Sequence, residues 1–350
     1  MTALPPLGRV AIILVNWNAW RDTVECLSSI LASDAAGIAD IFVVDNNSAD
    51  GSVEQIVQWC RQPTHVADYA RFAGVRHVGP RPIACRVWSA SGQATPTDAA
   101  AQLTIVRSGA NRGFAAGNNI GMMAAGLDRY DHFWLLNTDT VMRHDALHHL
   151  LNRAAAGQDV GMVGSTLLYY HRPDRVQAMG GGRLDRKTTA MHHIGADSPA
   201  ASVSPDGTAV EGEMAYVVGA SMLVSTEMVR SVGPMQPDYF LYFEEIDWAF
   251  RARQRFGLGY APLSIVFHKE GGSSSKAQPA FSLNLLYRNR LRFVGRFMPD
   301  RLAAARRVLA VELLRRVVKG QWTAARLVAL ALRDSRQLAG GAPALPSLET

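Results

Sequence analysis

Short apolar runs, most of them followed by a stretch of helical length, organise the first three quarters of the chain. Uninterrupted apolar runs fit strands that are buried on both faces of a parallel sheet. Their alternation with helices predicts an α/β fold in which a mostly parallel sheet is flanked by helices, beginning with a right-handed βαβ unit. The expected strands are Val10–Val15, Ile41–Val44, Leu103–Val106, Phe133–Leu136, Val160–Val163, Ala215–Val224 and Ile265–His268, and the expected helices span about 19–31, 52–60, 120–127 and 143–151, with a further helix opening at Glu244.

Two segments interrupt this alternation within a domain that we expect to span residues 1–280. Residues 61–102 are rich in Pro, Ala, Ser and Thr, and we interpret them as an insertion with a weak hairpin between Arg76 and Trp88. Residues 169–211 are rich in Gly, His, Pro and Ser, and they predict a loop or a small hairpin layer over the site.

The last part of the chain has a different character. Residues 281–338 repeat apolar positions at helical spacing among arginines, whereas residues 339–350 are expected to be disordered. The chain has a net charge of +6, and residues 286–336 contribute +10 of it, which leaves the remainder at −4. A basic amphipathic helix suits an anionic membrane surface. A solvated helix packed on the domain and an oligomer contact are the alternatives, and no nucleic-acid-binding signature accompanies the charge.

Composition restricts the class of protein. Of 350 residues, 48% are hydrophobic and 19% are charged, as in folded globular proteins. The three cysteines form neither a CxxC pair nor a zinc spacing, which favours a reducing compartment. The first nine residues do not resemble a signal peptide, and no apolar run reaches the length that spans a bilayer.

Polar residues follow the first two expected strands. Asn16 and Trp17 end the first strand, where Trp17 would stack on a base or pack at a helix-entry turn. Asp45 and Asn47 end the second strand. Asp45 would accept hydrogen bonds from a nucleoside, or it would form an Asx turn before the next helix.

A glycine-containing segment follows the third expected strand. Gly113 lies between Asn111 and Phe114, and Asn118 follows at the start of an Ala-rich helix. Small residues here would allow close approach to a ligand, and the helix would offer its N-terminal N–H groups to a phosphate. The segment is neither a P-loop nor GxGxxG, so a dehydrogenase is disfavoured.

Asp139 follows the apolar run that ends at Leu136. A lone carboxylate at the carboxyl end of a parallel strand suits Mg²⁺ or Mn²⁺, which proteins often hold with one or two carboxylates and substrate phosphates. The alternative is that Asp139 caps the following helix.

A second acidic cluster consists of Glu244, Glu245 and Asp247. Aromatic surroundings would raise the pKa of one carboxylate and suit it to general-base work, whereas the alternative is an acidic first turn of an amphipathic helix. His268 ends a later apolar strand and becomes a credible metal ligand beside a carboxylate. His192 and His193 are adjacent on an expected loop and are predicted to be solvated.

Together these motifs resemble the family 2 glycosyltransferases, and among them the bacterial rhamnosyltransferase-type enzymes of surface polysaccharide synthesis. The resemblance covers about residues 8–298 and implies the GT-A fold, a nucleotide-sugar-binding α/β domain. The segments that carry it, in order, are Val15–Asn18, Val44–Ser48, Asn111–Ala115, Leu136–Asp139, Glu244–Asp247 and His268.

The resemblance also implies roles for single residues. Trp17 and Asp45 resemble the positions that hold the nucleoside, with Asn16 and Asn47 beside them. The segment from Asn111 resembles the one beside the ribose and diphosphate. Asp139 resembles the metal-binding carboxylate, and His268 resembles a histidine near the metal and diphosphate. Glu245 resembles the catalytic base.

Two positions depart from the family pattern. Asn137 stands where many members carry an acidic residue, so metal affinity would rest on Asp139 and His268. The usual Glu-Asp pair is Glu244-Glu245 here, which leaves Asp247 as a second candidate for the base.

The implied reaction is inverting, with Mg²⁺ or Mn²⁺ as the cofactor. Its donor is a nucleotide sugar (dTDP-rhamnose favoured, a UDP-sugar possible as the alternative), and its acceptor is a saccharide or lipid-linked hydroxyl. A cytoplasmic protein, peripheral on the inner face of the cell membrane, would follow. The rival functions are a sugar nucleotidyltransferase, which should have a basic glycine-rich loop near the first strand, and a catalytically silent relative that binds a membrane partner.

Overall fold

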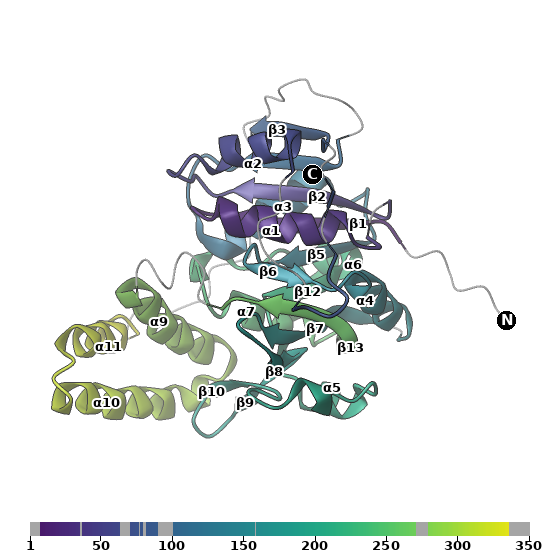
Figure 1. Ribbon diagram of the computed structural model, residues 1–350. Coiled ribbons are helices and arrows are strands. Elements are labelled where there is room, and N and C mark those ends of the chain that lie inside the picture. The colour runs from purple at the N-terminus through teal and green to yellow at the C-terminus, as the bar shows by residue number, and fades with distance from the viewer. Residues whose placement is uncertain are drawn as a thin grey trace.

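The computed structural model describes residues 8–35, 37–63, 71–76, 78–79, 82–89, 101–157, 159–270 and 279–335 (Figure 1). The strands are β1 (Val10–Asn16), β2 (Ala39–Asp45), β3 (Cys85–Ser89), β4 (Leu103–Arg107), β5 (His132–Leu136), β6 (Thr140–Met142), β7 (Val160–Tyr169), β8 (Arg172–Met179), β9 (Gly181–Asp185), β10 (Ala190–His193), β11 (Tyr216–Val217), β12 (Ser221–Ser225) and β13 (Gly257–His268). The α-helices are α1 (Trp20–Leu31), α2 (Ser52–Arg61), α3 (Gly113–Ala125), α4 (Ala146–Ala155), α5 (Thr208–Glu213), α6 (Thr226–Val232), α7 (Glu244–Ala252), α9 (Pro279–Phe297), α10 (Leu302–Val318) and α11 (Trp322–Asp334).

One large sheet forms the centre of the described chain. Its strands lie in the order β3-β4-β2-β1-β5-β12-β7-β13-β6, and β8 pairs with β7. The first five strands of this order, β3, β4, β2, β1 and β5, pair in parallel, and so do β7 and β13. Strand β12 is antiparallel to β5 and β7, β6 is antiparallel to β13, and β8 is antiparallel to β7. The expected α/β architecture with a mostly parallel sheet is therefore correct. The carboxyl ends of the parallel strands meet at one edge, where α/β sheets place ligands.

The apolar runs of the sequence are buried, as their pattern predicts. Residues 10–14 of β1 are fully buried, and so are 133–135 of β5. Helix α3 packs closely on β1 through Gly121, where an added Cβ would lie 2.4 Å from Ile13 Cγ2. The Ala-rich and Gly-rich composition of this helix thus brings its first turn against the edge of the sheet.

The expected hairpin between Arg76 and Trp88 is wrong. Residues 85–89 form β3, which pairs in parallel with β4 in a register that places Cys85 opposite Leu103. A hairpin needs antiparallel neighbours, and the partner of this strand instead follows the rest of the insertion. The other described residues between 61 and 102 belong to no strand.

The segment 169–211 is more regular than expected. Strand β8 extends the large sheet, whereas β9 pairs with β10 and β11 in a small antiparallel sheet of the order β10-β9-β11. Short helix α5 lies between β10 and β11 in the chain. This layer places residues of β8 and β10 beside the carboxyl ends of the parallel strands.

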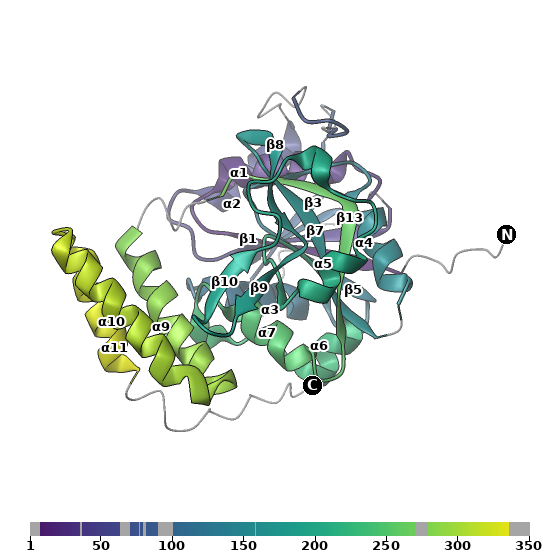
Figure 2. The same ribbon diagram turned by 90° about the horizontal axis from the view of Figure 1, so that it is seen from below.

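Helices α9, α10 and α11 pack on one another on one side of the molecule, as Figures 1 and 2 show. In the described part of the chain no helix is long and apolar enough to cross a membrane.

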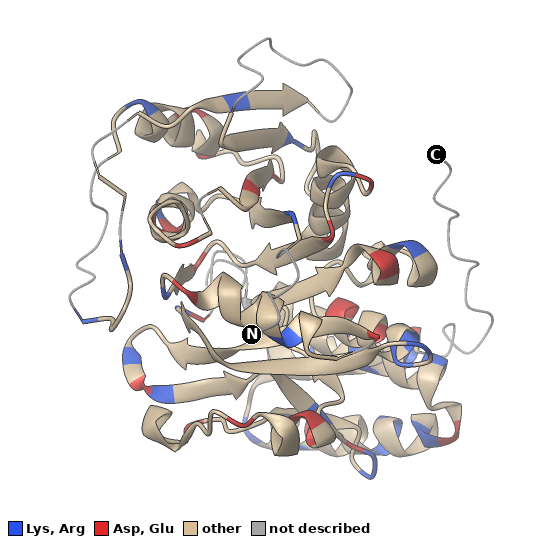
Figure 3. Ribbon diagram, turned by 90° about the vertical axis from the view of Figure 1, so that its right-hand side faces the viewer, with Lys and Arg blue, Asp and Glu red and all other residues tan. Residues whose placement is uncertain are grey.

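Three arginines of α9, Arg290, Arg292 and Arg296, bond to the α/β domain, so they belong to its packing rather than to a free basic surface. Elsewhere, on the face in Figure 3, basic and acidic residues are interspersed. The predicted disordered tail, 339–350, lies outside the described residues.

Candidate active site

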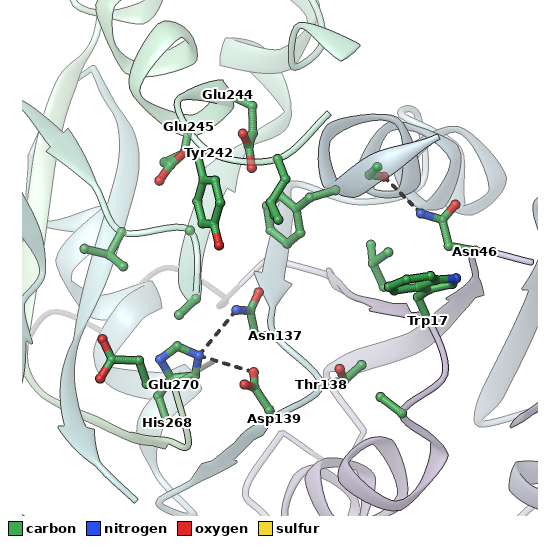
Figure 4. Close-up of a pocket in the computed structure, with 18 of the residues that line it drawn as sticks. Trp17, Asn46, Asn137, Thr138, Asp139, Tyr242, Glu244, Glu245, His268 and Glu270 are labelled. Atoms are coloured by element: carbon green, nitrogen blue, oxygen red, sulfur yellow. Dashed lines mark hydrogen bonds and ion pairs between the residues drawn. The ribbon is translucent and has the colours of Figure 1, made fainter. Parts of the chain in front are cut away.

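A pocket of about 780 Å³ lies at the carboxyl edge of the parallel strands. Its walls come from segments that are distant in sequence: the ends of β1, β2, β5 and β13, the start of α3, strands β8 and β10, and the segment before α7. Figure 4 shows two carboxylates, Glu244 and Glu245, on one side and the pair of Asp139 and His268 on the opposite side. Most of the predicted chemistry therefore meets in one cavity.

Asp139 and His268 form the polar pair on the floor of the pocket. Asp139 lies in the turn between β5 and β6, and His268 is the last residue of β13. His268 Nε2 is 3.2 Å from Asp139 Oδ1. The alternative that Asp139 caps the next helix is wrong, since Asp145 is at the N-cap of α4.

Burial and pairing set the ionisation of this pair. Burial alone would raise the pKa of Asp139, but His268 and Lys269 hold it below its usual value. Burial opposes the charged form of His268, and the nearby Asp139 more than offsets this, so the pKa of His268 is raised. The raised pKa of His268 and the lowered pKa of Asp139 both favour an ion pair between the two side chains.

Gln177 of β8 fixes the orientation of the His268 ring. Its Oε1 accepts a hydrogen bond from His268 Nδ1 at 2.9 Å, and Gln177 is buried. A neutral His268 therefore carries its proton on Nδ1 and turns the lone pair of Nε2 toward Asp139. This is how a metal-binding histidine is commonly oriented by its neighbours.

The donor set fits a divalent cation. A carboxylate oxygen and an imidazole nitrogen 3.2 Å apart match neighbouring ligands of an octahedral ion, which lie roughly 3 Å apart for bonds of about 2.1 Å. Among the described residues no group of three His, Cys, Asp or Glu side chains forms a complete metal cage. A cation here would take its remaining ligands from phosphate oxygens and water, as Mg²⁺ commonly does.

A further part of the pocket, apart from the glutamates and from the pair of Asp139 and His268, is lined by Trp17, Asn46, Asn111 and Gly113. Asn46 Nδ2 donates to Asn111 Oδ1 at 3.0 Å and to the Gly113 carbonyl at 3.1 Å, which joins the end of β2 to the start of α3. Figure 4 shows the indole of Trp17 beside Asn46 in the cavity. Phe114 lies nearby and also lines the pocket.

Four predicted binding residues do not line the pocket. Asn16 is fully buried and donates to Asp45 Oδ1 at 2.9 Å. Asp45 Oδ2 accepts from the backbone N–H of Ser48, which is the turn given above as the alternative to nucleoside binding. Asn47 is exposed, and its predecessor Asn46 takes the pocket position instead. Asn118 donates to the Phe114 carbonyl within α3.

The first N–H groups of α3 are already engaged. Gly113 N donates to Asn111 Oδ1 at 3.0 Å, and Phe114 N donates to the Phe240 carbonyl at 2.7 Å. The expectation that this helix offers these N–H groups to a phosphate is therefore wrong. The bond from Phe114 N holds the segment before α7 in place instead, and the bond from Gly113 N stays within the turn that opens α3.

Glu244 and Glu245 open α7 and line the pocket. In the described part of the chain, the Oε2 atom of each is buried without a hydrogen-bond partner. Burial, with Glu245 as its neighbour, raises the pKa of Glu244 well above its usual value. Burial raises the pKa of Glu245 to about 7, against the opposing effect of backbone hydrogen bonds. Glu245 thus titrates near neutral pH, as a general base should.

Asp247, the second candidate for the base, lies outside the pocket. It is fully buried, and its oxygens accept from Arg251 Nε at 2.8 Å and Arg296 Nη1 at 2.9 Å. Tyr239 also donates to it, at 3.0 Å. These partners occupy both carboxylate oxygens, so the geometry gives Asp247 a structural position.

Sequence reasoning missed several pocket residues: Asp22, Gln177, Tyr242 and Glu270 among the polar ones, and His193, which we expected to be solvated. His193 is partly buried on β10, and burial lowers its pKa. The one signal in the sequence was proximity to other motifs, since Tyr242 precedes the glutamate pair and Glu270 follows His268. Residues 271–278, which include the Gly/Ser run that follows His268 in the sequence, lie outside the described residues.

No protein-family model matches the sequence. Among curated proteins, the chain is 20% identical over 302 residues to the low-salt glycan biosynthesis hexosyltransferase Agl10 of Haloferax volcanii, covering 81% of this chain and 75% of that one. Among solved structures, it is similar to GalNAc-T7 with UDP, GalNAc and Mn²⁺ (TM-score 0.56, 13% identity, 83% of this chain). It is also similar to the mannosyltransferase PcManGT of Pyrobaculum calidifontis with GDP-Man and Mn²⁺ (TM-score 0.50, 15% identity, 98% of this chain and 79% of that one).

These similarities show that the chain has a GT-A-like glycosyltransferase fold, so the predicted fold class is confirmed. The chain spans about half the length of GalNAc-T7, at 48%. Membership of family 2 and a preference for rhamnose stay predictions.

Proposed function

We propose that this protein is an inverting, metal-dependent glycosyltransferase that moves a sugar from a nucleotide diphosphate sugar to a hydroxyl group. The observation that carries the proposal is the arrangement of two opposed groups in one pocket. A pair suited to hold a metal, Asp139 and His268, faces two carboxylates, the buried Glu244 and the partly buried Glu245. The similarity to a hexosyltransferase and to two glycosyltransferases with Mn²⁺ supports it.

Glu245 is the base in this proposal. It would take the proton of the acceptor hydroxyl while that oxygen attacks the anomeric carbon, and the bond from that carbon to the diphosphate oxygen breaks with its electron pair. The pKa of about 7 keeps a large fraction of Glu245 ionised at neutral pH without making it a weak base. Burial and the neighbouring Glu245 raise the pKa of Glu244 well above its usual value, which favours its protonated form, because two adjacent carboxylates in this setting are costly to ionise together.

The leaving diphosphate would lie on the side of the pocket that carries Asp139 and His268, which faces the two glutamates. A bound Mg²⁺ or Mn²⁺ would stabilise the negative charge that develops on it. Asp139 and His268 would hold this ion, and Gln177 keeps His268 in the orientation that binds it. Trp17, Asn46 and Asn111 line the end that suits the nucleoside, because they offer a ring face and amide groups.

The donor that we favour is dTDP-rhamnose, by sequence resemblance, with UDP-sugars as the alternative. The solved neighbours carry UDP and GDP-Man, so all three nucleotides belong in a test. The acceptor would be a saccharide or lipid-linked hydroxyl in surface polysaccharide synthesis.

A membrane surface is the further partner that we propose, with the protein peripheral on the inner, cytoplasmic face. An exposed face of α10, continued at the start of α11, carries apolar side chains at helical spacing. Val311, Leu314, Val318 and Trp322 form this docking face. Exposed basic residues flank it (Arg307, Arg315 and Lys319), and the one acidic residue of α10, Glu312, pairs with Arg316. An apolar face with a basic rim suits anionic lipid headgroups.

The test measures thermal stabilisation by dTDP, UDP and GDP, each with and without Mn²⁺, followed by turnover of the matching sugar nucleotides. Ligand at 100 times its Kd adds about 2.7 kcal/mol to the free energy of unfolding. We expect stabilisation by one nucleotide that requires the metal and is lost in Asp139→Ala. Asp174→Ala, an exposed carboxylate on β8, is the control and should behave as wild type.

Stabilisation without turnover would favour the catalytically silent relative. Release of a sugar 1-phosphate in place of transfer would favour the nucleotidyltransferase. A well-folded protein that no nucleotide stabilises would contradict the proposal.

A further inference from the structure

The segment just before α7 has an unusual backbone. Phe240 has φ 63° and ψ −57°, and the Leu241 N–H donates to the Tyr239 carbonyl at 2.7 Å, which together define a γ-turn. Tyr242 and Phe243 also have positive φ, at 68° and 74°. Non-glycine residues in such conformations cost on the order of 1–3 kcal/mol each and persist only when neighbouring groups hold them.

Helix α9 supplies those neighbouring groups. Asn289 Nδ2 donates to three carbonyls of the segment, those of Tyr239 at 2.7 Å, Leu241 at 2.8 Å and Tyr242 at 3.0 Å. Asn289 is 1% exposed, so water does not compete for these bonds. An amide has two N–H donors, and one of them is therefore shared between two carbonyls.

The neighbouring carbonyls are also occupied. Arg292 of α9 donates to the carbonyl of Asp238 at 2.5 Å, and Phe114 N donates to that of Phe240 at 2.7 Å. Every carbonyl from 238 to 242 thus accepts a hydrogen bond, and most of the donors come from α9. We call residues 238–243 the strained segment.

One turn further along α9, Arg296 joins the same structure. It bonds to Asp247 Oδ2 at 2.9 Å, the oxygen that also accepts from Tyr239 Oη. Asp247 lies in the first turns of α7, so α9 holds both the strained segment and the helix that follows it. Glu244 and Glu245 lie between these two attachment points.

We propose that Asn289 is a positioning residue for the catalytic glutamate pair: its hydrogen bonds to the strained segment set where α7 begins and therefore where Glu245 meets the acceptor. This inference rests on the proposed transfer reaction. Asn289 does not line the pocket, so it acts through the backbone and not on the substrate. Displacement of a catalytic group by about 1 Å can cost 100-fold in rate.

The variants are Asn289→Asp, which has nearly the same shape but replaces the donor NH₂ with oxygen, and Asn289→Ala, which removes all three bonds. Asn284→Asp is the control, because it makes the same change on α9. Among the described residues, no hydrogen bond joins Asn284 to the strained segment. We expect kcat to fall roughly 10- to 100-fold in both Asn289 variants. The donor KM and the affinity for nucleoside diphosphate with Mn²⁺ should stay within about twofold, because the metal pair and Trp17 lie on other elements.

Hydrogen–deuterium exchange provides a measurement that does not depend on turnover. Amides of residues 238–247 should exchange faster in the Asn289 variants, while those of β1 and β5 stay as in wild type. If the wild-type protein transfers no sugar, the proposed function is contradicted. The exchange experiment would still decide whether Asn289 holds the strained segment.

Three results would overturn the inference. The first is a kcat that is unchanged in folded variants. The second is an equal loss of kcat and of nucleotide binding, which would indicate a general loss of structure. The third is that neither variant folds, which would assign Asn289 to the stability of the whole domain.

Discussion

The carbonyl oxygen of Phe240 occupies the space that a side chain at Gly113 would need. An added Cβ at Gly113 would lie 2.2 Å from that oxygen, and Gly113 has φ +85°. The start of α3 and the strained segment before α7 therefore touch backbone to backbone. This contact joins the part of the pocket that is lined by Asn111 and Gly113 to the side that carries the glutamates.

Gly113→Ala should destabilise the protein and abolish transfer. Alanine at this φ costs about 1–2 kcal/mol, and the clash with a backbone oxygen adds a further cost, so we expect about 3 kcal/mol in the free energy of unfolding. Urea denaturation measures it. Gly109→Ala is a matched control, because its φ is +77° and nothing lies within 4 Å of its added Cβ. Equal effects at the two glycines would show that the contact with Phe240 is unimportant.

Gln177→Met should weaken metal binding. The variant loses the acceptor for His268 Nδ1–H and so releases the ring from the orientation that aims Nε2 at Asp139. Loss of such a supporting hydrogen bond typically costs 10- to 100-fold in metal affinity. Titration calorimetry of Mn²⁺ with the preferred nucleoside diphosphate measures it. Gln177→Glu keeps an acceptor opposite Nδ1 and should retain most of the affinity, and equal losses in both variants would contradict this explanation.

The transfer rate should rise with pH through a midpoint near 7. Glu245, whose pKa is about 7, must be ionised to accept the acceptor proton, so the rate grows as pH rises through that value and then levels off. Initial rates between pH 5 and 9 with saturating donor measure it. Glu245→Gln should lower the rate by a factor of 100 or more, on the order of the contribution of general-base catalysis, and the remaining activity should lack this midpoint.

The same carboxyl predicts a pH effect on stability with the opposite sign. Its pKa is about 7 in the folded protein and 4.5 as its ordinary value, so the folded state binds the proton more tightly. Stability should therefore fall as pH rises from about 4.5 to 7 and level off above that. Glu245→Gln removes this penalty, so its gain in melting temperature over wild type should be larger at pH 8 than at pH 5. A gain that is the same at both values would show that Glu245 titrates normally.

Leu314→Glu should release the protein from anionic membranes. The side chain is 63% exposed in the middle of the α10 docking face, so a carboxylate there costs little in stability but repels anionic headgroups. Co-sedimentation with phosphatidylglycerol-containing and phosphatidylcholine vesicles measures it. Met123→Glu on α3, where the side chain is 64% exposed, is the matched control and should sediment as wild type does. A wild-type protein that dimerises and ignores vesicles would assign the face to a second copy.

Strands β1, β2, β4 and β5, and parts of β7 and β13, were predictable because apolar runs that are buried on both faces leave a strong pattern. The edge at which their carboxyl ends meet follows from parallel pairing, and Asp139 and His268 were found in that way. The β3 strand was misjudged because its partner, β4, lies beyond residues 90–102 and pairs with it in parallel. The pattern of apolar and polar residues along a strand does not distinguish a parallel partner from an antiparallel one.

The rest of the site depends on details that sequence patterns do not carry. Asn46 and Asn47 are the same residue type, and the positive φ of Asn47, 62°, decides that only Asn46 faces the pocket. In the sequence, Asp247 resembles its neighbours Glu244 and Glu245. In the structure it forms an ion pair with Arg296, which is far along the chain. Gln177 lies on a strand without any motif, and only the fold brings it to His268.

Helix α9 makes the α/β domain and the C-terminal helices a single folding unit. A chain ending at residue 280, the boundary that composition indicates, would contain every strand that the structure describes and both Glu244 and Glu245, yet it would lack Asn289 and Arg296. Asp247 would then be a buried charge that keeps Arg251 but lacks Arg296, which is destabilising because its Oδ2 loses its charged partner. We therefore expect a catalytic fragment of this protein to be soluble and stable only when it extends at least to the end of α9 at Phe297.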